Sequence, residues 1–205
     1  MEDTKERILT TALRLFARDG YAGVSVRMIA EELHITKGAL YKHYKNKRDI
    51  FECIVERMNT TDYDRAVAYE MPEDTLDAMP QSYEELSLEQ VAAYSKAQFR
   101  YWTCDAFASD FRKLLTLEQY RNPEMAQLYQ QYLANGPLMY MADIFGRMLI
   151  DEQDAMGMAL AFYGPFFLYY SIYDGAEEKE AVLSSVDQYI DDFVAGLRPK
   201  TRTKQ

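Results

Sequence analysis

The sequence predicts an all-α protein, with an N-terminal three-helix helix-turn-helix domain over residues 1–58, a larger helical domain over 59–197 and a basic tail over 198–205. Three observations support this prediction. Apolar residues recur at three- and four-residue spacing along most of the 205 residues, and no stretch alternates apolar with polar residues as a strand would. Six prolines and nine glycines leave long segments uninterrupted, so that most of the chain can be helical.

Charge is distributed unevenly between these domains. Residues 1–48 carry 10 basic and 6 acidic side chains, for a net charge of +4, whereas residues 59–205 carry 12 basic and 24 acidic side chains, for −12. Salt screens interactions beyond roughly 8–10 Å, so a phosphate responds to the local charge rather than to the total of −10. The asymmetry therefore favours a nucleic-acid partner for the N-terminal domain.

The first two helices are predicted from apolar stripes and their capping residues. Apolar residues at four-residue spacing predict a helix over residues 5–19, which Gly20 ends as a left-handed cap. Ser25 is a good N-cap for a second helix, whose apolar positions extend to Leu33. We interpret His34, the next residue, as part of a turn rather than as a ligand.

A third, short helix is predicted over Thr36–Tyr44, and Asn46 caps a fourth. A helix, a tight turn and a short second helix form the layout in which the second helix enters the major groove of DNA. Four apolar residues would hold this helix against the domain: Leu33, Ile35, Leu40 and Tyr44. An exposed Gly38-Ala39 pair suits a helix that presses its backbone close to DNA.

The segment VRMIAEELHITKGALYKHYKNKRDIF resembles the N-terminal domain of the TetR family of regulators. The spacing of Leu40, Tyr41, His43 and Lys47 is the most specific part of this resemblance. The resemblance covers roughly residues 5–55, and the remainder is similar to the family only in length and helical layout.

The resemblance implies that the protein binds double-stranded DNA with a two-fold symmetric operator, and it implies nine contact residues. These are Ser25, Arg27, Thr36, Lys37, Gly38, Ala39, Tyr41, His43 and Lys47. Lys37, Gly38 and Ala39 would meet base edges, and the others would contact chiefly phosphates. Lys47 would add a point charge at the start of the fourth helix.

The basic side chains around this set have a simpler interpretation. Lys42, Lys45 and Arg48 are expected to be solvated or to attract DNA diffusely. The sequence departs from the family at His34, where members often have glycine. Because histidine tolerates a positive φ, the turn can still form.

The larger domain is predicted to continue as helices. The fourth helix runs on toward Tyr69, residues 71–87 form a loop with at most a short helix, and Pro137 lies at a helix start or kink. Five further helices are expected, near 87–104, 105–120, 123–149, 152–174 and 177–197. The tail has no apolar anchor and is predicted to be disordered, with contact to DNA as the alternative.

Residues 94–173 contain 18 aromatic residues and six methionines. Tyrosine and methionine suit an adaptable apolar pocket, so the set predicts a cavity for a small apolar or aromatic effector. The candidate lining residues are Phe99, Trp102, Phe107, Tyr140, Phe145, Phe162, Tyr163, Phe166 and Phe167. For each of these residues taken alone, core packing remains the simpler interpretation.

The last helix carries a wide apolar stripe opposite an acidic face. With 155–173 it would form an intersubunit four-helix bundle in a homodimer, as the resemblance also implies. The candidate interface residues are Val182, Val186, Tyr189, Ile190, Phe193 and Leu197. The alternative is that this stripe closes the core of a single subunit.

Residues 155–173 carry no charge, which is close to the length of a membrane-spanning helix. Several tyrosines, the central Gly164-Pro165 pair and acidic flanks argue against a span. The N-terminus lacks the apolar core of a secretory signal, so we expect a cytoplasmic protein without a membrane partner.

The sequence argues against an enzyme. It has no GxSxG, P-loop or Rossmann pattern, and its two histidines both lie in the predicted DNA-binding domain. Cys53 and Cys104 form no metal-ligand spacing, and no metal or cofactor is expected. We therefore predict a ligand-responsive transcription regulator, most simply a repressor released from its operator by an effector. The alternative is a helical adaptor or ligand-binding protein that does not contact DNA.

Overall fold

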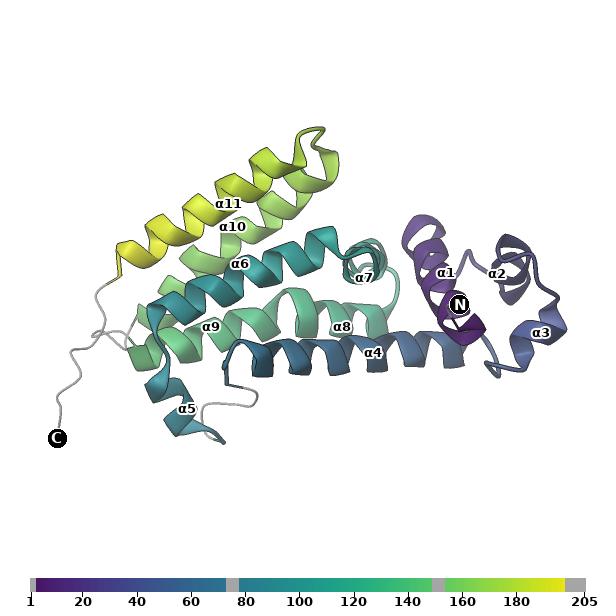
Figure 1. The fold of residues 1–205 in the computed structure, drawn as a ribbon, viewed down its shortest axis with the longest axis horizontal. Coiled ribbons are helices and arrows are strands. Elements are labelled where there is room, and N and C mark those ends of the chain that lie inside the picture. The colour runs from purple at the N-terminus through teal and green to yellow at the C-terminus, as the bar shows by residue number, and fades with distance from the viewer. Residues whose placement is uncertain (1–2, 73–77, 149–153, 198–205) are drawn as a thin grey trace. The chain divides into compact units, whose positions relative to one another are not determined.

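The computed structural model describes residues 3–72, 78–148 and 154–197, which form eleven helices and no strand (Figure 1). The predicted tail, 198–205, lies outside the described residues. By their contacts the helices divide into two compact units. Unit 1 is Met1–Asp62 with Cys104–Gln130, and unit 2 is Tyr63–Thr103 with Gln131–Gln205. The predicted domain boundary at residue 58 remains a prediction. Unit 1 also contains Cys104–Gln130, so the two units are not two continuous segments of the chain.

Unit 1 contains the helix-turn-helix. Its helices are α1 (Thr4–Asp19), α2 (Val26–Glu32), α3 (Lys37–Tyr41), most of α4 (Lys47–Ala68), α7 (Ala106–Glu118) and the first part of α8 (Pro123–Leu133). Side-chain oxygens cap the starts of these helices, at Ser25, Thr36 and Asn46 as the sequence predicts and at two further aspartates. The capping residues are Asp3, Ser25, Thr36, Asn46 and Asp105.

The core of unit 1 forms because α1 buries one face against several helices. Ile8, Leu13 and Phe16 are fully buried, and α1 packs extensively on α7. Leu114 and Leu115 of α7 are also fully buried. Burial of each such side chain stabilises the fold by about 1.5–3 kcal/mol, so α7 is an integral part of this unit.

Unit 2 contains the end of α4, then α5 (Pro80–Glu85), α6 (Leu88–Cys104), α9 (Asn135–Met148), α10 (Ala155–Gly175) and α11 (Lys179–Ala195). α10 packs on α9 and α11, and α10 and α11 form a helical hairpin (Figure 1). Aromatic rings fill the core: Phe99 stacks on Tyr170 with centroids 5.1 Å apart, and Phe162 contacts Phe193 at 5.0 Å.

The single helix predicted over 123–149 is wrong, because α8 ends at Leu133 and α9 begins at Asn135. Pro137 has no N–H to donate to the carbonyl of Leu133, four residues earlier. That carbonyl instead accepts a hydrogen bond from the Tyr163 hydroxyl at 3.0 Å. A Cβ atom on Gly136 would lie 2.0 Å from a backbone oxygen, so this break requires a glycine.

α10 also contains a proline that removes a backbone donor, Pro165, which lies inside the helix. The carbonyl of Ala161 loses its helical donor there, and the Tyr189 hydroxyl of α11 donates to it at 2.7 Å and to Phe162 O at 2.8 Å. By length and composition α10 is apolar enough to cross a membrane, although α9 and α11 cover part of it.

Candidate nucleic-acid interface

The short helix α3 is held by two buried residues. Leu40 is fully buried, and Tyr44 is 2% exposed with its hydroxyl donating to the carbonyl of Lys5 at 3.1 Å. Burial raises the pKa of Tyr44, so this hydroxyl stays a donor at any physiological pH. The Thr36 side chain accepts from Ala39 N at 3.1 Å and fixes the start of the helix. Leu33 and Ile35 are half-buried beside it.

The turn before α3 has the left-handed residue that the sequence predicts. His34 has a φ of 54°. Its N–H donates to Glu31 O at 3.1 Å, and Ile35 N donates to Ala30 O at 3.0 Å. These two bonds form a Schellman cap on α2, which sets the angle between the two helices.

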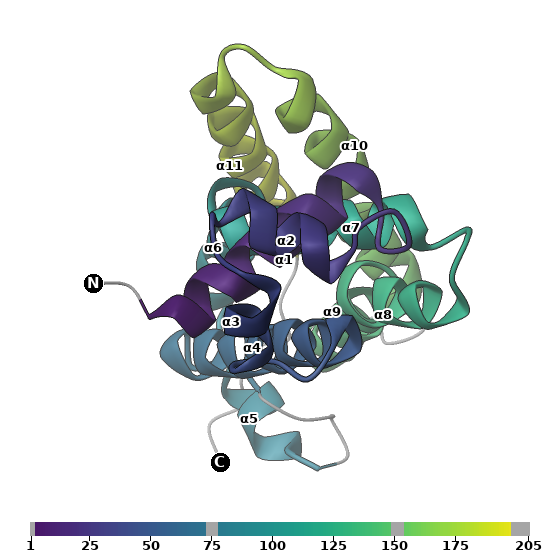
Figure 2. The ribbon, with the colours of Figure 1, turned by 90° about the vertical axis from the view of Figure 1, so that its right-hand side faces the viewer.

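The other side of α3 faces solvent. The outward residues are Thr36, Lys37, Gly38, Tyr41, Lys42 and His43. The Lys37 ammonium lies 5.5 Å from the centre of the Tyr41 ring, and Tyr41 is 44% exposed. Ala39 is half-buried. The helices α1, α2 and α3 lie together, with α2 and α3 facing the viewer in Figure 2. Of the three predicted base-contacting residues, Lys37 and Gly38 are thus exposed, whereas Ala39 is only partly accessible.

Ser25 and Arg27, at the start of α2, are also exposed. The Ser25 hydroxyl accepts from Met28 N at 3.2 Å, as an N-cap does. The Arg27 guanidinium forms an ion pair with Glu31 at 2.7 Å, one turn later. This partner was missed in the sequence, although four-residue spacing of opposite charges on a helix predicts it. DNA would have to compete with Glu31 for Arg27.

Lys47 differs from its expected role as an exposed point charge. Its ammonium donates to the carbonyls of Tyr21 at 2.8 Å and Val24 at 2.9 Å, and it lies 4.3 Å from the centre of the Tyr21 ring. Burial lowers the pKa of Lys47, and the nearby Glu118 carboxylate partly offsets this shift. The side chain thus fastens the connection between α1 and α2.

Arg48 is also tied within unit 1 rather than free for DNA. Its guanidinium bonds to both carboxylate oxygens of Glu124 and to Glu52. These hydrogen bonds raise the pKa of Arg48. Lys42 and Lys45 remain exposed, as expected for residues that attract DNA diffusely.

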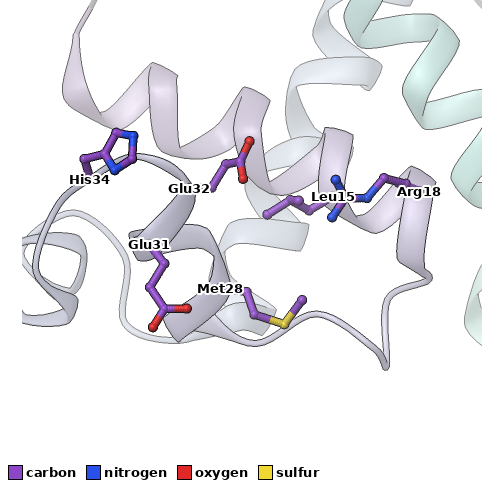
Figure 3. Close-up of a pocket in the computed structure, with 6 residues that line it drawn as sticks. All are labelled: Leu15, Arg18, Met28, Glu31, Glu32 and His34. Atoms are coloured by element: carbon purple, nitrogen blue, oxygen red, sulfur yellow. The ribbon is translucent and has the colours of Figure 1, made fainter.

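An open depression of about 380 Å³ lies between α1 and α2. It is lined by Leu15, Arg18, Met28, Glu31, Glu32 and His34 (Figure 3). Its carboxylates are already paired, Glu31 with Arg27 and Glu32 with Arg14 at 2.5 Å. No local sequence pattern predicts this depression, because its lining residues come from separate helices.

The nine aromatic residues predicted to line an effector cavity are divided between the units. Phe107 belongs to unit 1, where the Arg57 guanidinium lies 4.0 Å from its ring centre. The other eight belong to unit 2. Phe99, Trp102, Phe145, Phe162 and Phe166 are buried there, mostly against other rings.

The remaining three aromatic candidates have other surroundings. Tyr163 and Tyr140 donate their hydroxyl hydrogens to the carbonyls of Leu133 and Pro72, whereas Phe167 is exposed. A cavity formed by the set of nine remains a prediction.

The predicted dimer residues on α11 face the interior of their own unit to different degrees. Val182, Val186 and Ile190 are buried within the single chain, so they have little area left for a partner. Tyr189, Phe193 and Leu197 are half-buried. The exposed apolar surface lies instead on α10, at Met156, Leu160, Phe167, Leu168 and Ile172.

The described residues contain no group of three or more histidine, cysteine or acidic side chains arranged to hold a metal ion. Cys53 is half-buried and Cys104 is exposed, and neither forms a disulfide.

Residues 8–54 match the family described as bacterial regulatory proteins, tetR family. Over 47 residues the chain is 49% identical to the uncharacterized HTH-type transcriptional regulator YerO of Bacillus subtilis, a match to 23% of this chain and 16% of that protein. It is 42% identical over 55 residues to the regulator AcrR of Shigella flexneri, which is 27% of this chain and 26% of AcrR. The chain thus covers about a quarter or less of the length of these relatives.

The fold is similar to solved structures over almost the whole chain. SmeT, the repressor of the Stenotrophomonas maltophilia multidrug efflux pump SmeDEF, has a TM-score of 0.62 at 19% identity, covering all of this chain and 94% of SmeT. A TetR/AcrR-type regulator of Aquifex aeolicus has a TM-score of 0.63 at 16% identity, covering 94% and 98% of the two chains. Residues 8–54 thus carry the sequence of the tetR family of bacterial regulatory proteins, and the chain as a whole shares the all-helical fold of these solved structures.

Proposed function

We propose that this protein is a cytoplasmic transcription regulator that binds a two-fold symmetric operator as a homodimer and responds to a small-molecule effector. The observation that carries the proposal is the outward face of α3. Lys37 and Tyr41 are exposed on a helix that Leu40 and Tyr44 anchor from behind. A helix anchored in this way can enter a major groove without losing its own packing.

The exposed face of α10 supports the homodimer. Met156, Leu160, Leu168 and Ile172 recur at four-residue spacing around Gly164, and none of them is covered within the chain. An apolar stripe of this kind is costly in water and suits a second copy of the same helix. With α11 beside it, two subunits would form the four-helix bundle that the sequence predicts.

The effector and the direction of regulation are inferred from relatives. The chain is 37% identical over 59 residues to the class C tetracycline repressor of Escherichia coli, and SmeT has been solved in complex with triclosan. A small apolar or aromatic effector that releases the protein from DNA fits the aromatic core of unit 2. Helix α4 continues from Lys47 to Ala68 and has residues in both units, so it is a covalent path between them.

Selection of DNA from a random-sequence pool, followed by a mobility shift with random competitor, tests the proposal. We expect Lys37→Ala and Tyr41→Ala each to weaken binding to the selected duplex by about tenfold, because the first variant loses a base contact and the second a phosphate contact. Arg121→Ala removes the same charge from an exposed position outside α3 and should leave affinity within about twofold. If the unmodified protein selects no duplex, the chain is instead an adaptor or ligand-binding protein.

A further inference from the structure

The link Gly20–Val24, which joins α1 to α2, is bonded from two sides by more distant residues. Lys47 donates to the carbonyls of Tyr21 and Val24 at 2.8 and 2.9 Å. The carboxylate of Glu118, the last residue of α7, accepts from the backbone N–H of Tyr21 at 3.0 Å. The backbone of this link is therefore held by side chains from α4 and α7.

The contact with Glu118 depends on the absence of a side chain at Gly20. A Cβ atom at this position would lie 2.6 Å from Oε1 of Glu118, and Gly20 has a φ of 79°. Glu118 itself is only 5% exposed. A carboxylate buried to this degree requires hydrogen-bond donors, so its bond to the link is a specific contact rather than a chance approach.

The link leads directly into the proposed DNA contacts. Ser25, the next residue, caps α2 by accepting from Met28 N, and Arg27 projects from the first turn. Because Ser25 and Arg27 follow the link directly in the chain, a displacement of the link moves them with it. Lys47 and Glu118 therefore hold the link from which the first turn of α2 starts.

We infer that Glu118 is a positioning residue for DNA binding, which holds the start of α2 through the Tyr21 amide. The inference rests on the proposed function. It gives α7 a role in DNA binding, although Glu118 lies 64 positions after the end of the family match at residues 8–54. Any rearrangement that moves the end of α7 would reach Ser25 and Arg27 through this carboxylate.

Two replacements at Glu118 separate the hydrogen bond from simple packing. Glu118→Met has a similar length but accepts no strong hydrogen bond, whereas Glu118→Gln keeps an oxygen that can accept from Tyr21 N–H. Glu56→Met removes the same negative charge from an exposed site on α4 and is the matched control. Each full-length variant is titrated well below its melting temperature with a duplex that the unmodified protein selects from a random-sequence pool.

We expect Glu118→Met to bind this duplex about tenfold more weakly, while Glu118→Gln and Glu56→Met stay within about threefold of the unmodified protein. The slope of log K against the logarithm of the salt concentration should decrease in magnitude by about 1 for Glu118→Met, because a phosphate contact from the start of α2 is lost. A residue with a merely structural role would not change this slope in the folded protein. Faster hydrogen exchange at the Tyr21 amide of Glu118→Met provides a measurement that does not need DNA.

Wild-type affinity and slope in a folded Glu118→Met variant would overturn the inference, as would a Glu118→Gln variant as weak as Glu118→Met. Either result would leave the DNA-binding proposal intact, since the unmodified protein would still select its duplex. If the unmodified protein selected none, the proposed function would fail first and the role of Glu118 with it.

Discussion

At the scale of single residues, the N-terminal domain has fewer basic side chains available to DNA than its composition indicates. Lys47, a predicted DNA contact, and its neighbour Arg48 are both bonded within unit 1. Lys37 and Tyr41 face solvent. A basic residue in the sequence therefore does not by itself predict a phosphate contact. A half-buried lysine can instead donate to backbone carbonyls of its own domain.

Lys47→Met should lower the free energy of unfolding by about 1.5–3 kcal/mol, since two charge-assisted hydrogen bonds to backbone carbonyls are lost. Urea denaturation of the DNA-free protein measures this change. Lys42→Met, at an exposed position, should change it by no more than about 0.5 kcal/mol. Equal stabilities for the two variants would instead support a purely DNA-contacting role for Lys47.

His34 offers a second test at this scale. Its φ of 54° is strained for a residue with a Cβ atom, so His34→Gly should stabilise the free protein by about 0.5–1 kcal/mol. Thermal denaturation is the measurement. A decrease in stability would mean that contacts of the imidazole outweigh the backbone strain.

At the scale of secondary structure, two prolines shape unit 2 in the same way. Pro137 and Pro165 each deprive a carbonyl four residues earlier of its helical donor, and tyrosine hydroxyls from other positions bond to these carbonyls. Burial raises the pKa of Tyr189 to about 12, so its hydroxyl remains protonated at neutral pH. Tyr163 and Tyr189, predicted for an effector and a dimer, thus both have structural bonds within the chain.

Tyr189→Phe should therefore cost about 1–2 kcal/mol of stability, because it leaves two carbonyls without this donor. The same substitution should cost clearly less in a Pro165→Ala background, where residue 165 regains an N–H for the carbonyl of Ala161. A double-mutant cycle in urea measures the difference. The same cost in both backgrounds would show that the hydroxyl does not compensate for the proline.

At the scale of the whole molecule, α10 presents an apolar face that the subunit leaves exposed. Leu168 is 65% exposed, and a Cβ atom on Gly164 would meet nothing within 4 Å. Exposed apolar residues on one helix face favour association, and a glycine at the centre lets a second helix approach closely.

Gly164→Arg should abolish dimerisation without unfolding the subunit, because a Cβ atom at this position meets no atom of the subunit within 4 Å and the longer side chain can extend into solvent. Sedimentation or light scattering should then give a mass near 23.9 kDa instead of twice this value. Ala93→Arg, at an exposed position on α6, is the control and should remain dimeric. A Gly164→Arg protein that stays dimeric would place the interface elsewhere, and binding of the unmodified protein to lipid vesicles would indicate that a membrane covers this face.

The sequence by itself determined the helical class, the helix-turn-helix and its capping residues, and the left-handed turn at His34. These features depend on local spacing and on backbone preferences, which act over a few residues. Only the tertiary structure decided that α7 joins the N-terminal helices, that Lys47 and Glu118 hold the same link, and that α8 and α9 are separate. Such contacts join residues far apart in the chain, and no local pattern specifies which buried partner a charged or hydroxyl group will find.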